Sequence, residues 1–192
     1  MGSRFMDSGQ HAERQSPGIL WSFCKFLIAI LLVLGLSVLL RTFVFQAYEI
    51  PSGSMETTIM TGDMVFAEKV SYHFREVEQG DIVTFDDPLT SNRTLIKRVI
   101  AVAGQTVDIN DEDGLVYVDG EALEESYTTG ATYTLESSVT YPYTVPEGCV
   151  WVMGDNRENS QDSRYFGAIE VSTVSARAVF VYWPLSEIKM LE

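Results

Sequence analysis

The chain has 192 residues, of which 46% are hydrophobic and 21% are charged. This length suits one domain of ordinary size, and the apolar fraction excludes a disordered, highly charged chain. With 27 acidic and 13 basic residues the net charge is −14, which argues against nucleic acid as a partner because phosphates would be repelled. Two cysteines are too few for a disulfide scaffold or a cysteine-rich metal site.

The N-terminal part contains one long apolar segment. Residues 26–40 carry no charge, and the apolar stretch extends back to residue 18 with Lys25 as its single charge. About 20 helical residues cross a bilayer core, so we predict a transmembrane anchor over residues 18–41. A buried core helix is the alternative, but such a helix would show a polar face. No small-x-small cleavage pattern follows, so we expect the anchor to remain uncleaved.

Charge is distributed unevenly around this segment. Residues 1–41 contain four bases and two acids, a charge of +2, so the other nine bases and twenty-five acids give residues 42–192 a charge of −16. Three of the four N-terminal bases lie before or at the start of the apolar stretch. The positive-inside rule therefore predicts that residues 1–17 are a short cytoplasmic tail and that the rest of the chain after the anchor is extracytoplasmic. Cys24 and Cys149 are then separated and are not expected to pair.

After residue 42 the pattern changes to short segments rich in Val, Ile, Phe, Tyr and Trp, which is typical of strands. These segments are 64–70, 81–85, 95–103, 106–110, 115–118, 149–153 and 176–183. Turn signals separate most of them, and Asp119-Gly120 predicts a two-residue hairpin turn. We therefore predict an all-β sandwich or distorted barrel, with residues 124–145 as an insertion or peripheral β element. Cys149 is expected to be a buried strand residue.

The first segment that could carry chemistry is Ile50-Pro51-Ser52-Gly53-Ser54-Met55. Its glycine allows a sharp turn or the close approach of another chain, and its proline restricts the entry. A flexible Ser/Gly tether is the alternative, although a tether would rarely place apolar residues at both ends. The segment offers a serine hydroxyl as a candidate nucleophile.

The second segment surrounds Lys97. Strand alternation places this lysine on the same face as Leu95 and Val99, among aliphatic side chains. Burial lowers the pKa of a lysine from its reference value of about 10.4, and a neutral amine can take a proton from a serine hydroxyl. An edge-strand lysine that guards against aggregation is the alternative.

The third segment, residues 153–167, is dense in short polar side chains and follows a predicted strand. An elaborate loop is one interpretation, because such residues cap turns. A calcium site is another, but the spacing of Asp155, Asn156 and Asp162 does not match the D-x-[DN]-x-[DN]-G-x₅-E pattern. Two arginines in the segment also disfavour a cation, so no metal site is predicted.

The histidines narrow the choice of a general base. The chain contains only His11 and His73, and His11 precedes the anchor. If Ser54 is a nucleophile, Lys97 is therefore the first candidate for its base and His73 the second.

These segments together resemble the type I signal peptidase family of membrane-bound serine proteases. The resemblance is carried, in chain order, by the N-terminal anchor, residues 51–55, Gly62-Asp63, residues 97–100, residues 154–157 with 159–160 and 162–164, residues 176–178 and residues 182–185. The order of the blocks makes the match specific, and it covers almost the whole chain. Lysine rather than histidine at position 97 is similar to the bacterial form of the family.

The resemblance implies specific roles for residues in these blocks. Ser54 is expected to be the nucleophile and Lys97 the general base, with Ser52 helping the Ser54 N–H group to hold the oxyanion. Ser160 is expected to orient the amine of Lys97. Two further residues are expected to brace that loop, namely Asp162 and Arg164. The implied fold is an antiparallel all-β catalytic core with a more variable second β region, which residues 104–145 could supply.

The implied reaction is removal of signal peptides from secretory preproteins after a small-x-small pattern, through an acyl-enzyme and without a metal or cofactor. The substrate is expected to bind as an extended strand. Our candidates for the pocket residues are Ile50, Met55, Leu95 and Ile96. Implied partners are membrane lipid and the protein-export machinery, and the implied location is the cell membrane as a single-pass protein.

The sequence departs from the family pattern at two places and leaves two rival interpretations. Thr57 stands where the family usually has proline, and residues 101–105 lack the usual Gly and Pro; both positions concern loop geometry. One rival is a Ser–Lys protease of the self-cleaving repressor type, which the anchor disfavours. The other is a membrane-tethered, non-catalytic β-domain that binds peptides or cell-wall components.

Overall fold

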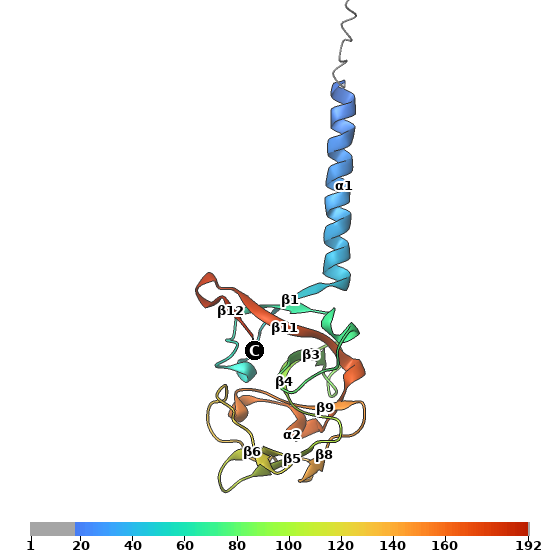
Figure 1. The fold of residues 1–192 in the computed structure, drawn as a ribbon. Helices are drawn as coiled ribbons and strands as arrows, with labels where there is room; N and C mark the ends of the chain where they lie inside the picture. The colour runs from blue at the N-terminus through green and yellow to red at the C-terminus, as the bar shows by residue number, and fades with distance from the viewer. Residues whose placement is uncertain (1–17, 192) are drawn as a thin grey trace, which may run out of the picture. The chain divides into compact units, whose positions relative to one another are not determined.

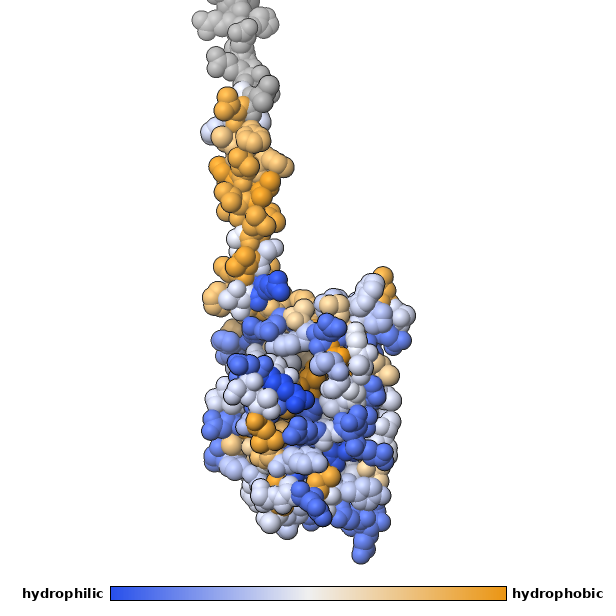
Figure 2. Space-filling model, turned by 180° about the vertical axis from the view of Figure 1, so that it is seen from behind, coloured by the Kyte–Doolittle hydropathy of each residue, from blue (hydrophilic) through white to orange (hydrophobic). Residues whose placement is uncertain are grey.

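The computed structural model describes residues 18–191, so the predicted tail of residues 1–17 lies outside the described residues. Its first element is the helix α1, Ile19–Phe43, which ends two residues after the predicted anchor. The helix is long and apolar enough to cross a membrane, because 25 helical residues extend about 37 Å. Its described side chains are mostly exposed, and Figure 2 shows apolar side chains along the face in view.

The main sheet holds eight strands in the order β1-β2-β11-β3-β4-β9-β10, with β12 paired to β11. Every pairing between these strands is antiparallel. Their bounds are β1 Phe45–Glu49, β2 Met64–Glu68, β3 Ile82–Asp86, β4 Thr94–Val102, β9 Cys149–Met153, β10 Ile169–Glu170, β11 Val174–Trp183 and β12 Lys189–Met190. The expected antiparallel all-β fold is confirmed, and Figure 1 shows the long strand β11 next to β3, its partner in the sheet.

A second sheet contains four short antiparallel strands in the order β7-β6-β5-β8. They are β5 Thr106–Asn110, β6 Leu115–Val118, β7 Glu121–Ala122 and β8 Tyr143–Thr144. The predicted hairpin turn joins β6 to β7, with φ of 54° at Asp119 and 83° at Gly120. Positive φ at both central residues is the geometry that favours Asp-Gly in this turn.

The remaining helices are single turns, which explains why no helical period is visible after residue 43. Their bounds are η1 Gly53–Met55, η2 Ser71–His73, η3 Arg157–Asn159, α2 Ser163–Phe166, η4 Val171–Thr173 and η5 Leu185–Glu187. Strand β1 was not predicted, because its sequence alternates imperfectly and lies at the sheet edge, where only one neighbour constrains it. The other unpredicted strands, β8, β10 and β12, have two residues each.

Three hydrophobic clusters form the core. One packs beneath η1 and includes Met55 and Ile59, another surrounds Trp151, and the last includes Phe85 and Val99. None of the three contains a described residue of α1. The β-rich part from Leu40 onward is therefore a compact unit with its own core.

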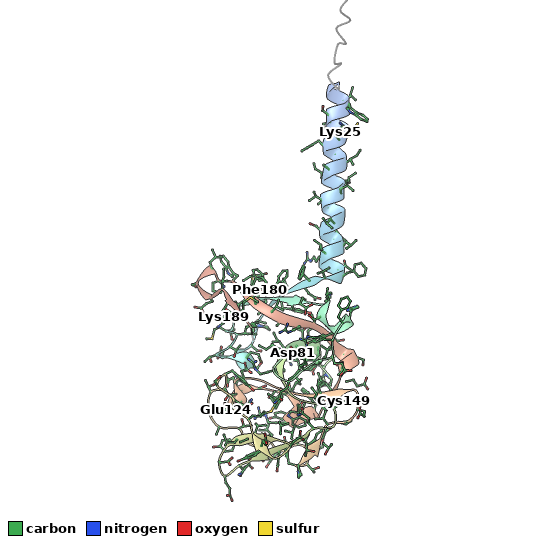
Figure 3. The ribbon with its side chains drawn as sticks, viewed as in Figure 1. Lys25, Asp81, Glu124, Cys149, Phe180 and Lys189 are labelled. Atoms are coloured by element: carbon green, nitrogen blue, oxygen red, sulfur yellow. The ribbon has the colours of Figure 1, made fainter. Side chains whose placement is uncertain are left out.

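Asp81 joins segments that are distant in the sequence, at the position labelled in Figure 3. Its carboxylate accepts two hydrogen bonds of 2.8 Å from Arg75 and one of 3.1 Å from the Tyr72 hydroxyl. Arg177 of β11 forms an ion pair with the same carboxylate at 2.9 Å. This buried acid therefore ties the segment before β3 to β11.

Both cysteines are free. Cys24 lies in α1, and Cys149 is half-buried at the start of β9 rather than fully buried as expected. Its partial exposure follows from its place at the end of the strand, where the neighbouring Val150 is already buried.

Candidate active site

Ser54 lies in the middle of η1, directly after β1. Its side chain is 7% exposed, while the next residue, Met55, is fully buried in the core. The entry to η1 is fixed by two backbone hydrogen bonds, from Ile50 N to Asp63 O at 2.9 Å and from Gly62 N to Ile50 O at 2.8 Å. The buried Met55 side chain on one side of Ser54 and the hydrogen-bonded turn at Ile50 on the other hold the Ser54 hydroxyl in place.

Lys97 lies in β4, the strand between β3 and β9, and is 2% exposed. Both faces of β4 are buried, which is why a lysine here is almost completely withdrawn from solvent. Its Nζ atom donates to Ser54 Oγ at 2.7 Å and to the Ile96 carbonyl oxygen at 3.0 Å. The structure therefore brings the two candidate residues into direct contact across 43 residues of sequence.

Burial lowers the pKa of Lys97 to about 8, because removing the ammonium group from water penalises its charged form. The nearby guanidinium of Arg93 lowers this pKa further, whereas the carboxylates of Asp162, Asp155 and Asp87 oppose the shift. At pH 7 roughly one amine in ten is then neutral, compared with roughly one in a few thousand at the reference pKa. The amine can accept a proton near neutral pH.

The loop after β9, residues 154–162, is here called the active-site loop. Asn156 donates its backbone N–H to Ser54 O at 3.1 Å and its side-chain Nδ2 to Gly53 O at 3.0 Å. Gly154 is required by close packing, since an added Cβ would come within 2.5 Å of Ser54 O and closer still to Ser160 Oγ. The loop therefore grips the backbone of η1 directly.

A cavity of about 430 Å³ opens over the Ser54–Lys97 pair. Its lining residues are Ser52, Ser54, Arg93, Leu95, Lys97, Glu158, Asn159, Ser160, Gln161 and Tyr165. Ser52 is exposed. Ser160 Oγ is buried and has no hydrogen-bond partner within the described part of the chain, so the contact with the amine of Lys97 that the resemblance implies is not made here.

Asp162 and Arg164 form a buried ion pair, with Arg164 Nε 2.9 Å from Asp162 Oδ1. Asp162 also caps the short helix α2 by accepting from Arg164 N at 3.2 Å, and its Oδ2 accepts from Gly154 N at 3.1 Å. Arg164 in turn donates to the carbonyl oxygen of Arg157 at 2.7 Å. Together they connect the two ends of the active-site loop.

The proposed pocket residues divide into two groups. Ile50, Leu95 and Ile96 line a small cavity of about 40 Å³, and Leu95 also lines the cavity over Ser54. Met55 lines neither and belongs to the core beneath η1. Its side chain points away from the cavity because it follows Ser54 in a tight turn and supplies the buried face.

The sequence comparison gives the family. The profile described as "Signal peptidase, peptidase S26" matches residues 23–183. The chain belongs to this signal peptidase family. It is a signal peptidase I, a serine endopeptidase anchored to a membrane by its N-terminal helix, and its substrates are signal peptides of preproteins.

Relatives of this signal peptidase come from several organisms. It is 42% identical over 186 residues to a "Probable signal peptidase I-1" from Synechocystis, covering 92% of this chain and 90% of the relative. It is 38% identical to "Thylakoidal processing peptidase 1, chloroplastic" from Arabidopsis thaliana, covering 79% of this chain and 46% of that protein. A crystal structure of a signal peptidase I from Enterococcus faecalis is 30% identical, covers 54% of this chain and 97% of that chain, and gives a TM-score of 0.45.

His73, the second candidate base, lies elsewhere in the signal peptidase. It is exposed at the end of η2, and its Nδ1 atom lies 3.1 Å from the carbonyl oxygen of Lys69. It lines a different cavity from the one over Ser54. Among residues 18–191, no group of three or more His, Cys, Asp and Glu side chains could hold a metal ion.

Two buried ion pairs near the site were not predicted. Arg98, next to Lys97, binds both carboxylate oxygens of Asp155 at 2.9 Å. Arg157 binds the carboxylate of Glu125. The sequence contains a signal for such pairs in Arg98, Arg157 and Arg164. A buried guanidinium requires a carboxylate or several carbonyl groups as partners. No feature of the sequence indicates that Glu125 is one of these partners.

Proposed function

We propose that Ser54 is the nucleophile and Lys97 the general base of this signal peptidase. The observation that carries the proposal is the 2.7 Å contact between Ser54 Oγ and the buried Nζ of Lys97. Hydrogen-bond distance between a nucleophile and its base is the geometric requirement for activation. The lowered pKa of Lys97 supplies the second requirement, a neutral amine.

In the proposed reaction, neutral Lys97 takes the proton of the Ser54 hydroxyl while Oγ attacks the carbonyl carbon of the scissile bond. The resulting tetrahedral intermediate collapses as the Lys97 ammonium gives its proton to the leaving amine, which releases the mature chain. Lys97 then takes a proton from water while the water oxygen attacks the ester. As this second tetrahedral intermediate collapses, the Lys97 ammonium returns the proton to Ser54 Oγ, which releases the signal peptide and restores both the Ser54 hydroxyl and the neutral amine. Burial favours both half-steps because it keeps the amine weakly basic.

We further propose that the Ser54 N–H group and the Ser52 hydroxyl hold the oxyanion. The presence of Ser52 in the lining of the same cavity supports this assignment. One such donor is typically worth about 2.7–4 kcal/mol of transition-state stabilisation. Ser160 is proposed to orient the Lys97 amine once substrate closes the cavity, with Asp162 and Arg164 holding its loop.

The signal peptide is proposed to bind as an extended strand along β4. On the side opposite β3, strand β9 pairs only with Arg98 and later residues, so the backbone edge of residues 94–97 is open there. An open edge supports recognition by strand addition. The small side chains of the signal peptide would pack against Ile50, Leu95 and Ile96. Met55 is not proposed as a pocket residue because it is buried in the core.

We propose that the N-terminus faces the cytoplasm and that residues 42–192 lie on the other side of the cell membrane, with residues 18–41 as the anchor and residues 104–145 as a variable subregion. The excess of bases before the apolar stretch supports this orientation. Membrane lipid and the protein-export machinery are the proposed partners. A thylakoid membrane is the second candidate location, which the name of the Arabidopsis relative favours.

The test compares the parent enzyme with Ser54→Ala, Lys97→Ala and His73→Ala on a preprotein in detergent. We expect loss of cleavage after the small-x-small site in the first two variants, by about 10³-fold or more, and parental activity in the third. Retention of cleavage by Lys97→Ala together with its loss in His73→Ala would reverse the base assignment. Retention by Ser54→Ala would remove the nucleophile assignment.

A further inference from the structure

The connection between β7 and β8, residues 123–142, was expected to be peripheral, yet it packs against the active-site loop. Thr129 forms a parallel bridge with Asn156, the residue that binds the backbone of η1. Ser137 Oγ donates to Arg164 O at 2.8 Å. The connection therefore contacts both the active-site loop and the short helix α2 that follows it.

The main contact between residues 123–142 and the active-site loop is made by the buried guanidinium of Arg157. The side chain of Arg157 is fully buried, and Glu125 of the connection, with a side chain 9% exposed, binds it through both carboxylate oxygens. Thr132, also in the connection, accepts a further hydrogen bond of 2.7 Å from the same guanidinium. Burial opposes the charge of Arg157, but hydrogen bonding and charge from Glu125 hold the pKa of this guanidinium above its ordinary value.

Arg157, held by Glu125, is in turn hydrogen-bonded to the part of the active-site loop that packs against Ser54. Its Nε donates to the carbonyl oxygen of Gly154 at 3.0 Å, and Gly154 is the position packed against Ser54 O and Ser160. The residue before Arg157, Asn156, binds Ser54 O through its backbone N–H. Glu125 is therefore connected to the backbone of Ser54 by two noncovalent links, its ion pair with Arg157 and the hydrogen bond from the adjacent Asn156 to Ser54 O.

A second contact of residues 123–142 reaches β4, the strand that carries Lys97. The guanidinium of Arg98 lies over the ring of Tyr127, 4.0 Å from its centroid, and Arg98 is bound to Asp155 of the active-site loop. Arg98 directly follows Lys97 in β4. Residues 123–142 thus contact Asn156, which is hydrogen-bonded to Ser54, and Arg98, which follows Lys97 in the chain.

We propose that residues 123–142 clamp the active-site loop and that Glu125 is a positioning residue for the Ser54–Lys97 pair. A buried guanidinium that loses its carboxylate must be rehydrated, which requires Arg157 and the loop around it to move outward. That movement would loosen Ser54 and admit water to Lys97. This inference deepens the proposed function and rests on it.

The test uses the full chain in detergent and compares the parent with Glu125→Gln and Glu125→Asp. Glu124→Gln is the matched control, since Glu124 is the adjacent exposed carboxylate, labelled in Figure 3. For each variant we would measure kcat, KM and thermal unfolding, and the pH dependence of kcat/KM. Glu125→Gln should lower kcat by about tenfold or more, because a misplacement of about 1 Å at a reacting pair can cost about 10²-fold, with KM within about twofold.

The decisive readout is the acid limb of the pH profile. Water reaching Lys97 raises its pKa toward the ordinary value, so the limb of Glu125→Gln should move to higher pH, while the charged groups that face Lys97 (Asp87, Asp155, Asp162 and Arg93) are unchanged in every variant. Glu125→Asp should recover part of kcat and move the limb less, and Glu124→Gln should match the parent.

Two outcomes would overturn the clamp. One is a Glu125→Gln enzyme with a lower unfolding temperature but parental kcat per folded molecule and an unmoved acid limb, which would make Glu125 structural only. The other is an equal effect of Glu124→Gln. If Glu125→Gln fails to fold, Thr132→Val, which removes a single hydrogen bond to Arg157, should shift the limb in the same direction, and an unmoved limb rejects the clamp. Failure of the proposed catalytic pair is seen separately, as cleavage retained by Ser54→Ala.

Discussion

Lys97 owes its chemistry to its surroundings rather than to its type. The same strand places Arg98 and Lys97 side by side, and both are 2% exposed. The guanidinium of Arg98 is bound to a carboxylate at 2.9 Å. Within the described part of the chain, the Lys97 amine forms hydrogen bonds only with the Ser54 hydroxyl and a carbonyl oxygen. Neutral acceptors do not repay the loss of hydration, so burial prevails over the more distant carboxylates and lowers the pKa of the amine.

The lowered pKa predicts how activity depends on pH. The base must be neutral, and a lysine is neutral above its pKa, so kcat/KM should rise with pH and reach half its plateau near pH 8. Initial rates between pH 6 and pH 10 would measure this limb. His73→Ala should leave the limb in place; a limb that vanishes in His73→Ala would instead identify the histidine as the titrating base.

At the scale of elements, the site is assembled by the contact of one strand with one loop. Strand β4 supplies Lys97 and Arg98, and the loop after β9 supplies Asp155 and the residues that hold η1. The buried Arg98–Asp155 pair fixes this loop against β4 at the point where the β4–β9 pairing begins. The register of one strand pair therefore determines where the serine meets the lysine.

Replacing Asp155 tests this connection. Asp155→Asn keeps the shape of the side chain but removes the charge that pairs with buried Arg98, so the free energy of unfolding should fall by about 3–5 kcal/mol. Denaturant unfolding of the full chain in detergent would measure the change. The exposed Asp86 at the end of β3 provides the control, and Asp86→Asn should change stability by less than about 0.5 kcal/mol. Equal effects at the two positions would contradict this account.

At the scale of the whole molecule, the chain combines two units with separate origins of stability. The side chains of residues 20–43 of α1 are exposed in the structure, and a bilayer would cover this apolar surface. The three core clusters of the β-rich unit are built from other residues. The anchor is therefore expected to provide location and not folding energy for the catalytic unit.

Removing the anchor separates these contributions. A chain that begins at residue 44 should unfold within about 4 °C of the 192-residue chain, a shift of roughly 1 kcal/mol or less, and should no longer float with liposomes. Circular dichroism melts and liposome flotation would measure the two effects. Persistent flotation would show that the β-rich unit binds lipid by itself, and a much lower unfolding temperature would show that α1 contributes to its core.

The sequence by itself determined the features that depend on local pattern. The anchor follows from an uninterrupted apolar run, the longer strands from apolar segments bounded by turns, and the β6–β7 turn from Asp119-Gly120. The order of the blocks around Ser54 and Lys97 gave the family. Each of these signals lies either in neighbouring residues or in the order of segments along the chain, so no knowledge of the fold is needed to find them.

Only the tertiary structure decided which residues meet. It placed Met55 in the core, His73 away from the cavity, and Glu125 beside Arg157. It also left Ser160 Oγ without a hydrogen-bond partner among residues 18–191. Glu125 lies 32 residues from its partner, in a segment that resembles any polar loop. Which carboxylate neutralises a buried cation depends on how distant segments pack, and the pKa of Lys97 depends on the water which that packing excludes.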